Sequence, residues 1–138
     1  MLDFFMKKAN IQYINYQNMQ QCINDTNTLI INTLNSGEQE CLILNTLDYN
    51  REQEIFNKLI ENYDFKSKKI VIYGKNCNDN SAINKANQLI DLGFQYIYVY
   101  NAGLFEWILL QEIYSEEHFK TTSVVTDILK FKSEKIIY

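Results

Sequence analysis

The stretch KKIVIYGKNCNDNSAINKANQLIDLGF, residues 68–94, decides the fold of this 138-residue chain. It begins with "KIVIY", a continuous apolar run of the kind found in central parallel strands. After a short polar loop, "SAINKANQLIDLG" places apolar residues at helical spacing, with Gly93 well positioned to end the helix. The loop between strand and helix contains Cys77, which raises the question of whether this thiol is a nucleophile.

Similar patterns extend the alternation of strand and helix over the chain. Apolar runs predict further strands at residues 10–15, 28–34, 41–47 and 96–100. Apolar residues at helical spacing predict further helices at residues 16–25, 50–63 and 103–114. Asn15 or Asn18 is the expected cap of the first helix. The pattern of residues 121–138 is compatible with either a helix or an extended chain. The alternation of strands and helices before them predicts one α/β domain with a mainly parallel sheet.

The composition excludes several classes of function. A formal net charge of -4 and a pI of about 5.0 leave no basic face for nucleic acid. No apolar run approaches the ~20 residues that span a membrane. An acid at Asp3 and a short apolar stretch before the first lysines are the wrong order for a signal peptide, so we expect a cytoplasmic protein.

The cysteines and the histidine predict no metal and no cofactor. Cys22, Cys41 and Cys77 are far apart in the sequence, and the single His118 has no ligand spacing to any of them. An odd number of cysteines also argues against a disulfide framework. We expect Cys22 and Cys41 to be small buried residues, and Trp107 to be a core anchor.

The loop after the strand at residues 69–73 is the candidate site. Ligands of parallel sheets bind beyond the carboxyl ends of the strands. The candidate anion-binding residues are Gly74, Lys75, Asn76, Asn78, Asp79, Asn80 and Ser81. The amides and the helix dipole would lower the pKa of Cys77, with Asn80 or Ser81 as the helix cap. The charges of Lys75 and Asp79 cancel, however, which makes the loop a poor cradle for anions.

Residues 70–107 resemble the second half of a rhodanese-like domain. Four stretches carry this resemblance: "IVIYG", "NSAINKANQLIDLGF", "YIYVY" and "NAGLFEW". The first half fits more loosely through "TLIINTL", "SGEQE" and "CLILNTL". The combination of "GKNCND" and "GLFEWILLQEIY" is most similar to rhodanese-like proteins of large DNA viruses. The resemblance implies a single three-layer domain over residues 1–138, with helices on both faces of the sheet. It also implies the host-cell cytoplasm or the virion as the location if the source is viral.

The departures from the family concern its chemistry. Gly74 stands where active rhodaneses carry the nucleophile, and Cys77 lies further into the loop. The family's Asp-x-Arg motif, which braces the loop, appears as Asn32-Thr33-Leu34, so both charges are absent. No arginine follows Cys77 within the loop, which argues against phosphatase chemistry of the Cys-loop-Arg kind.

Two functions therefore stay open. The first is a catalytically degenerate rhodanese-like domain that binds or regulates an unknown protein partner, or self-associates as a homo-oligomer. The second is a sulfurtransferase that passes sulfane sulfur through a persulfide on Cys77 to a thiol acceptor. A nucleotide-binding domain is a weaker third reading, because neither GxGxxG nor GxxxxGK[ST] is present.

Overall fold

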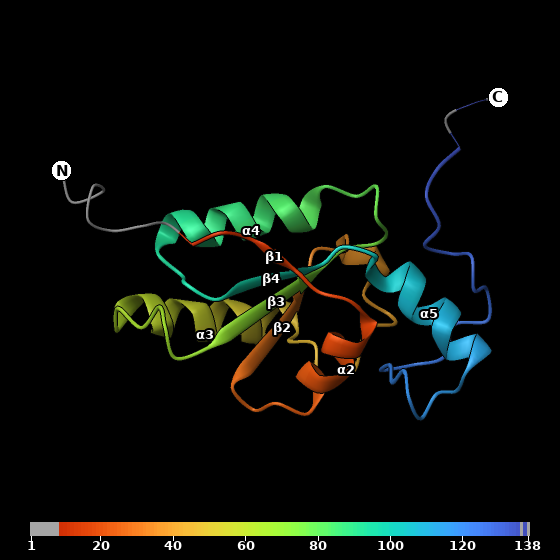
Figure 1. Ribbon diagram of the computed structural model, residues 1–138, viewed down its shortest axis with the longest axis horizontal. Coiled ribbons are helices and arrows are strands. Elements are labelled where there is room, and N and C mark those ends of the chain that lie inside the picture. Colours follow the sequence, from red (N-terminus) through yellow and green to blue (C-terminus); the bar gives the residue numbers. More distant parts are fainter. Residues whose placement is uncertain (1–8, 136, 138) are drawn as a thin grey trace.

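The computed structural model describes residues 9–135 and 137, and its centre is a four-stranded parallel sheet (Figure 1). The strands follow the order β1-β4-β3-β2 and comprise β1 (Gln12–Tyr13), β2 (Thr28–Asn32), β3 (Lys69–Tyr73) and β4 (Ile97–Tyr100). The helices are α2 (Tyr16–Ile23), the 3₁₀ turn η1 (Ser36–Glu38), α3 (Tyr49–Glu61), α4 (Ser81–Leu92) and α5 (Gly103–Ile113). The predicted α/β architecture with a parallel sheet is therefore confirmed.

The strand register brings the carboxyl ends of three strands to one edge of the sheet. Tyr73 at the end of β3 pairs with Asn32 at the end of β2 and with Tyr100 at the end of β4. The segments that leave these strands consequently start side by side. This places the candidate loop after β3 between the segments that follow β2 and β4.

Side chains alternate between the two faces of the sheet, and helices cover both faces. One face packs against α3 and α4 in a cluster that includes Ile31, Phe56, Ile72, Ala86 and Leu89. The opposite face packs against α2 and α5 in a cluster that includes Met19, Ile30, Val71, Tyr73 and Trp107. This arrangement confirms the expected three layers.

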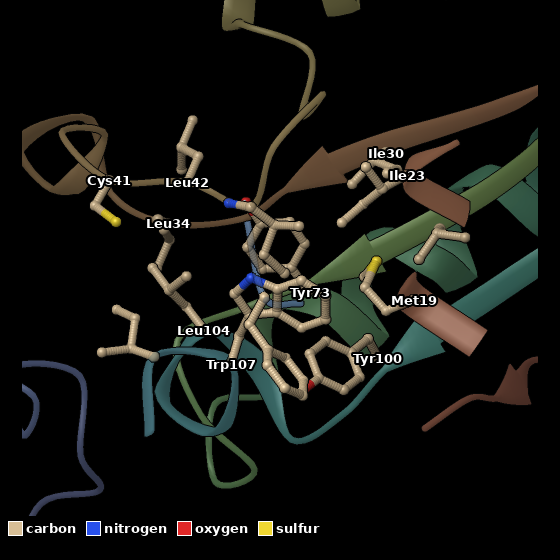
Figure 2. Packing of buried hydrophobic residues seen from close by; sticks show 14 of the residues in the cluster. Met19, Ile23, Ile30, Leu34, Cys41, Leu42, Tyr73, Tyr100, Leu104 and Trp107 are labelled. Atoms are coloured by element: carbon tan, nitrogen blue, oxygen red, sulfur yellow. The ribbon is translucent and has the colours of Figure 1, made fainter. Parts of the chain in front are cut away.

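Tyr73 and Trp107 anchor the second cluster (Figure 2). The Tyr73 hydroxyl accepts a hydrogen bond from the Ile43 amide at 3.1 Å and shares one with Thr46 Oγ1 at 2.8 Å. Burial raises the pKa of Tyr73, so its phenol stays neutral. Trp107 is fully buried, packs edge-on against Tyr100 and donates from Nε1 to the Lys120 carbonyl at 3.0 Å. The prediction of Trp107 as a core anchor is confirmed.

The prediction of a strand at residues 41–47 is wrong. The segment makes only isolated bridges, with Ile43 opposite Thr121 and Thr46 opposite Ile30. Asn45 adopts a left-handed φ of 68°, which interrupts the extended backbone that a strand requires. The apolar pattern has another cause, because Cys41, Leu42 and Ile43 are buried against the sheet.

The two ends of the chain follow the predictions less closely. The strand predicted at residues 10–15 shrinks to β1, and Asn15 and Asn18 together form a capping box at the start of α2. Residues 121–135 contain turns and extended chain without a helix. The N-terminal pattern weighed against a signal peptide lies in residues 1–8, outside the described part. No described helix is long and apolar enough to cross a membrane.

Candidate functional site

A cleft of about 460 Å³ lies where β2 and β3 end. Ten residues line it: Thr33, Leu34, Asn35, Glu38, Lys75, Asn76, Asn78, Asp79, Ser81 and Glu134. Five of them belong to the predicted loop, whereas the predicted Gly74, Cys77 and Asn80 are not lining residues. Nine of the ten lining residues have polar or charged side chains, so the cleft is suited to a polar ligand.

The Asp79 carboxylate fills the space in front of Gly74. A Cβ on Gly74 would lie 3.1 Å from Asp79 Oδ2 and 3.2 Å from Thr33 Oγ1. Asp79 Oδ2 accepts a hydrogen bond from the Lys75 amide at 3.2 Å, and Oδ1 accepts one from the Ser81 amide at 3.0 Å. The carboxylate therefore holds two of the amides that the loop would offer to a bound anion.

Asp79 also caps α4, which begins at Ser81. Asn80 occupies the N-cap position, which confirms one of the two predicted positions, but its side chain makes no capping bond. Partial burial acts to raise the pKa of Asp79, but hydrogen bonds from Ser81 and Lys75 together with the Lys75 charge outweigh it and lower that pKa. A carboxylate at a helix N-terminus is also favoured by the helix dipole.

The Lys75 side chain forms an ion pair with Glu38 and is therefore not available to a ligand of the loop. Its Nζ lies 2.7 Å from Glu38 Oε2 in η1. The other carboxylate oxygen of Glu38, Oε1, is buried, and within residues 9–135 no hydrogen-bond partner reaches it. The positive charge of Lys75 is thus compensated locally by Glu38.

Cys77 is exposed, and its sulfur lies 3.9 Å from Asn78 Oδ1. The nearby loop amides are engaged elsewhere. The Asn78 amide donates to Asn76 Oδ1 at 3.0 Å, and the Asp79 amide donates to the Asn76 carbonyl at 3.2 Å. With the Lys75 and Ser81 amides held by Asp79, four loop amides serve internal acceptors.

Two neutral side chains, Asn32 and Gln39, hydrogen-bond to each other at the end of β2, where the sequence lacks both charges of the Asp-x-Arg motif. Asn32 Oδ1 accepts from the Leu34 amide at 3.1 Å and from Gln39 Nε2 at 2.8 Å, and Asn32 Nδ2 donates to Gln39 Oε1 at 3.2 Å. Thr33 Oγ1 and Ser81 Oγ share a hydrogen bond of 2.7 Å. The Thr33–Ser81 bond joins the segment after β2 to the start of α4, and the Asn32–Gln39 bonds hold the end of β2 to the residues after η1.

The loop is held from its other side by α5 and by the C-terminal segment. The amides of Leu104 and Phe105 donate to the carbonyls of Gly74 and Lys75, each at 3.0 Å. The Asn76 side chain, only 7% exposed, donates from Nδ2 to the Phe131 carbonyl at 3.0 Å. Sequence reasoning missed Phe131, because no local pattern connects it to the loop.

The remaining predicted residues lie away from the cleft. Cys41 is buried and its thiol donates to the Ser123 carbonyl at 3.4 Å. Cys22 is half-buried, and burial followed by the charge of Asp25 raises the pKa of its thiol. His118 is exposed. In the part of the chain that the structure describes, no group of three or more His, Cys, Asp or Glu side chains is arranged to hold a metal.

Comparison with known proteins gives structural likenesses only, since no family model and no curated protein matches the sequence. Ygr203w of Saccharomyces cerevisiae, described as a protein tyrosine phosphatase of the rhodanese family, aligns with a TM-score of 0.63 at 13% identity, over 87% of this chain and 97% of that one. The As-Sb reductase of Leishmania major aligns with a TM-score of 0.51 at 16% identity, over 76% and 79%. The BH2092 protein of Bacillus halodurans aligns with a TM-score of 0.55 at 19% identity, over 70% of each chain. From these likenesses and its own topology, the chain has a rhodanese-like fold.

Proposed function

We propose that this protein is a rhodanese-like domain that has lost group-transfer chemistry and acts as a binding or regulatory module for a protein partner. One observation carries the proposal: the Asp79 carboxylate stands 3.1 Å from the Cβ position of Gly74, where active rhodaneses carry the nucleophile. The chain's own anion therefore takes the space of the reacting group.

Electrostatics supports the same conclusion. Thiosulfate and phosphate esters are anions, and an active loop offers them free amides and positive charge. Here Asp79 already accepts from the Lys75 and Ser81 amides, and Glu38 neutralises the Lys75 side chain. Two like charges ~4 Å apart repel by about 4 kcal/mol near a protein surface, so Asp79 disfavours a second anion.

A sulfurtransferase acting through Cys77 is the second candidate, favoured by the exposure of this thiol beside the cleft. In that reaction the Cys77 thiolate attacks the sulfane sulfur of thiosulfate. The sulfur–sulfur bond of thiosulfate breaks, a cysteine persulfide forms and sulfite leaves with the electron pair. The four loop amides that serve Asn76 and Asp79 weaken this candidate, because they are not directed at the Cys77 sulfur.

The binding role rests on the polar cleft, which combines the carboxylates of Glu38, Asp79 and Glu134 with the amides of Asn35 and Asn78. A protein segment or a second copy of this chain is the occupant we propose. A viral source and a cytoplasmic location, in the host cell or the virion, remain predictions that belong to this proposal.

Intact-mass analysis after incubation with thiosulfate, and separately with a persulfide donor, tests the proposal. We expect no gain of one sulfur atom in the native protein, while a small alkylating agent still modifies Cys77. A one-sulfur gain that disappears in Cys77→Ser and persists in Cys22→Ser would overturn the degenerate function and support the sulfurtransferase. The Cys22→Ser variant is the matched control because its thiol is only half-buried.

A further inference from the structure

The C-terminal part of the chain is firmly attached to the domain as far as Ser123. The Thr122 amide donates to the Leu42 carbonyl at 2.8 Å, and Ser123 Oγ donates to the Glu40 carbonyl at 2.7 Å. The Ser123 carbonyl in turn accepts from the Cys41 thiol at 3.4 Å. Residues 120–123 therefore form a fixed point beside the segment that follows η1.

Beyond Ser123 the chain runs past α5 with local backbone hydrogen bonds (Figure 1). The Lys130 amide donates to Asp127 and the Lys132 amide donates to Leu129, both within this segment. Phe131, at 2% exposed, is the one fully buried residue among residues 124–135, and Val125 and Ile128 pack half-buried against the same core cluster. The 3.4 Å ion pair between Lys130 and Glu40 is largely exposed, so it contributes little to the free energy that holds this segment on the domain.

Phe131 connects this segment to the candidate site. Its carbonyl accepts from Asn76 Nδ2 at 3.0 Å, and the same Asn76 side chain accepts from the Asn78 amide at 3.0 Å. Three residues further on, Glu134 lines the cleft. The segment thus forms one wall of the cleft and supplies the acceptor that orients a buried loop side chain.

We propose that residues 124–135 are a strap that opens and closes beside the cleft, hinged at Ser123 and latched by Phe131. A segment with one fully buried anchor, two half-buried apolar contacts and mostly local hydrogen bonds opens in a local step, separately from the unfolding of the sheet. Opening removes Glu134 from the cleft wall and takes from Asn76 the acceptor of its Nδ2. The strap therefore regulates the width of the cleft and the order of the loop, whatever the cleft binds.

Hydrogen exchange measured by mass spectrometry tests the coupling between latch and loop. In Phe131→Ala we expect the amides of residues 74–81 to exchange on the order of tenfold faster, as a loss of about 1.4 kcal/mol in the closing free energy would produce. The amides of residues 69–73 should keep their protection. Phe131→Leu should restore most of the loop protection, and Leu129→Ala, at a 48% exposed position of the strap, should change nothing. Unchanged loop exchange in Phe131→Ala, or equal loss of protection in loop and strand, would overturn the strap.

Limited trypsin digestion of the native protein provides a test that needs no variant. An opening strap predicts early cleavage after Lys130 and Lys132, with the bonds after Lys58 in α3 and Lys85 in α4 intact. If all four bonds are equally resistant under native conditions, the strap does not open locally and the inference is wrong. Neither experiment measures sulfur transfer. A negative result would therefore overturn the inference about the strap without bearing on the proposed function.

Discussion

The carbonyl oxygen of Gly74 lies 2.7 Å from the point that a Cβ on Gly103 would occupy, so the start of α5 touches the loop after β3 backbone to backbone. Gly103 has a φ of +73°, a conformation that other residues rarely adopt. The next amide, that of Leu104, donates to the Gly74 carbonyl at 3.0 Å. The path of the loop is therefore determined partly by a helix that begins about a fifth of the chain length after Gly74.

Gly103→Ala should destabilise the fold strongly. Left-handed backbone in a residue with a side chain costs about 1–3 kcal/mol, and the new methyl group would press on backbone atoms that cannot rotate away. Gly37→Ala is the matched control, because a Cβ there meets no atom within 4 Å, and its effect should stay within about 0.5 kcal/mol. Urea unfolding measures both free energies. Equal losses in the two variants would contradict the close approach of α5 and the loop.

Asp79→Ala should open the loop to anions. Removing the carboxylate frees the Lys75 and Ser81 amides and removes the charge that repels a ligand. NMR titration with sulfate or thiosulfate should shift these two amide signals in Asp79→Ala and leave them unchanged in the native protein. Glu116→Ala, at an exposed acidic position, controls for the change in net charge. Native protein that binds sulfate at the same amides would show that Asp79 does not occupy the site.

Acid should remove the stabilisation that Asp79 provides. Its pKa is lower in the folded protein than the usual value near 3.8, so the carboxylate stabilises the fold above that value and the effect disappears as the pH falls through the folded pKa. At pH 7 we expect the free energy of unfolding of the native protein to exceed that of Asp79→Asn by about 0.3–1 kcal/mol, the usual effect of a charge at a helix N-terminus. Urea unfolding between pH 7 and pH 3 should show this difference shrinking below about pH 4. A difference that is constant over the range would contradict the assignment.

Gln39→Ala should destabilise the amide pair that replaces the charged brace. The change removes the donor to Asn32 Oδ1 and to the Leu34 carbonyl, and it leaves Asn32 Nδ2 without Gln39 Oε1. Loss of partners for partly buried polar groups costs about 1–3 kcal/mol. Gln53→Ala is the control, since the Gln53 side chain hydrogen-bonds to the exposed Tyr49 on the same helix. The urea midpoint of Gln39→Ala should fall clearly below that of Gln53→Ala, and equal midpoints would show that the pair contributes nothing.

Local sequence patterns were sufficient to predict the elements around the site. The apolar run at residues 69–73 became β3, and the helical spacing after it became α4, closed by Gly93 at a φ of +118°. Both patterns are local and report burial directly. The apolar run at residues 41–47 looked the same, but its buried residues belong to a connection that turns at Asn45. Burial alone does not distinguish a strand from a buried loop.

The functional site itself stays a prediction. Ligands of parallel sheets bind beyond the carboxyl ends of the strands, and a cleft lies in that position after β3. The partners of Lys75 and Asn76 could not be predicted, because Glu38 and Phe131 reach them only through the tertiary fold. The role of Asp79 had a local signal that was missed: an aspartate two residues before Ser81 is able to cap a helix through its side chain.

The position of β1 at the edge of the sheet has a consequence for synthesis on the ribosome. β1 is hydrogen-bonded to β4, and the Ile14 amide donates to the Val99 carbonyl at 3.0 Å. A chain is made from its N-terminus, so β2 and β3 can pair while the ribosome is still producing the second half. Of the four described strands, β1 pairs only with β4, so it has no partner in this sheet until residues 97–100 have left the exit tunnel. Pairing of β1 with β4 is therefore the step that completes the sheet.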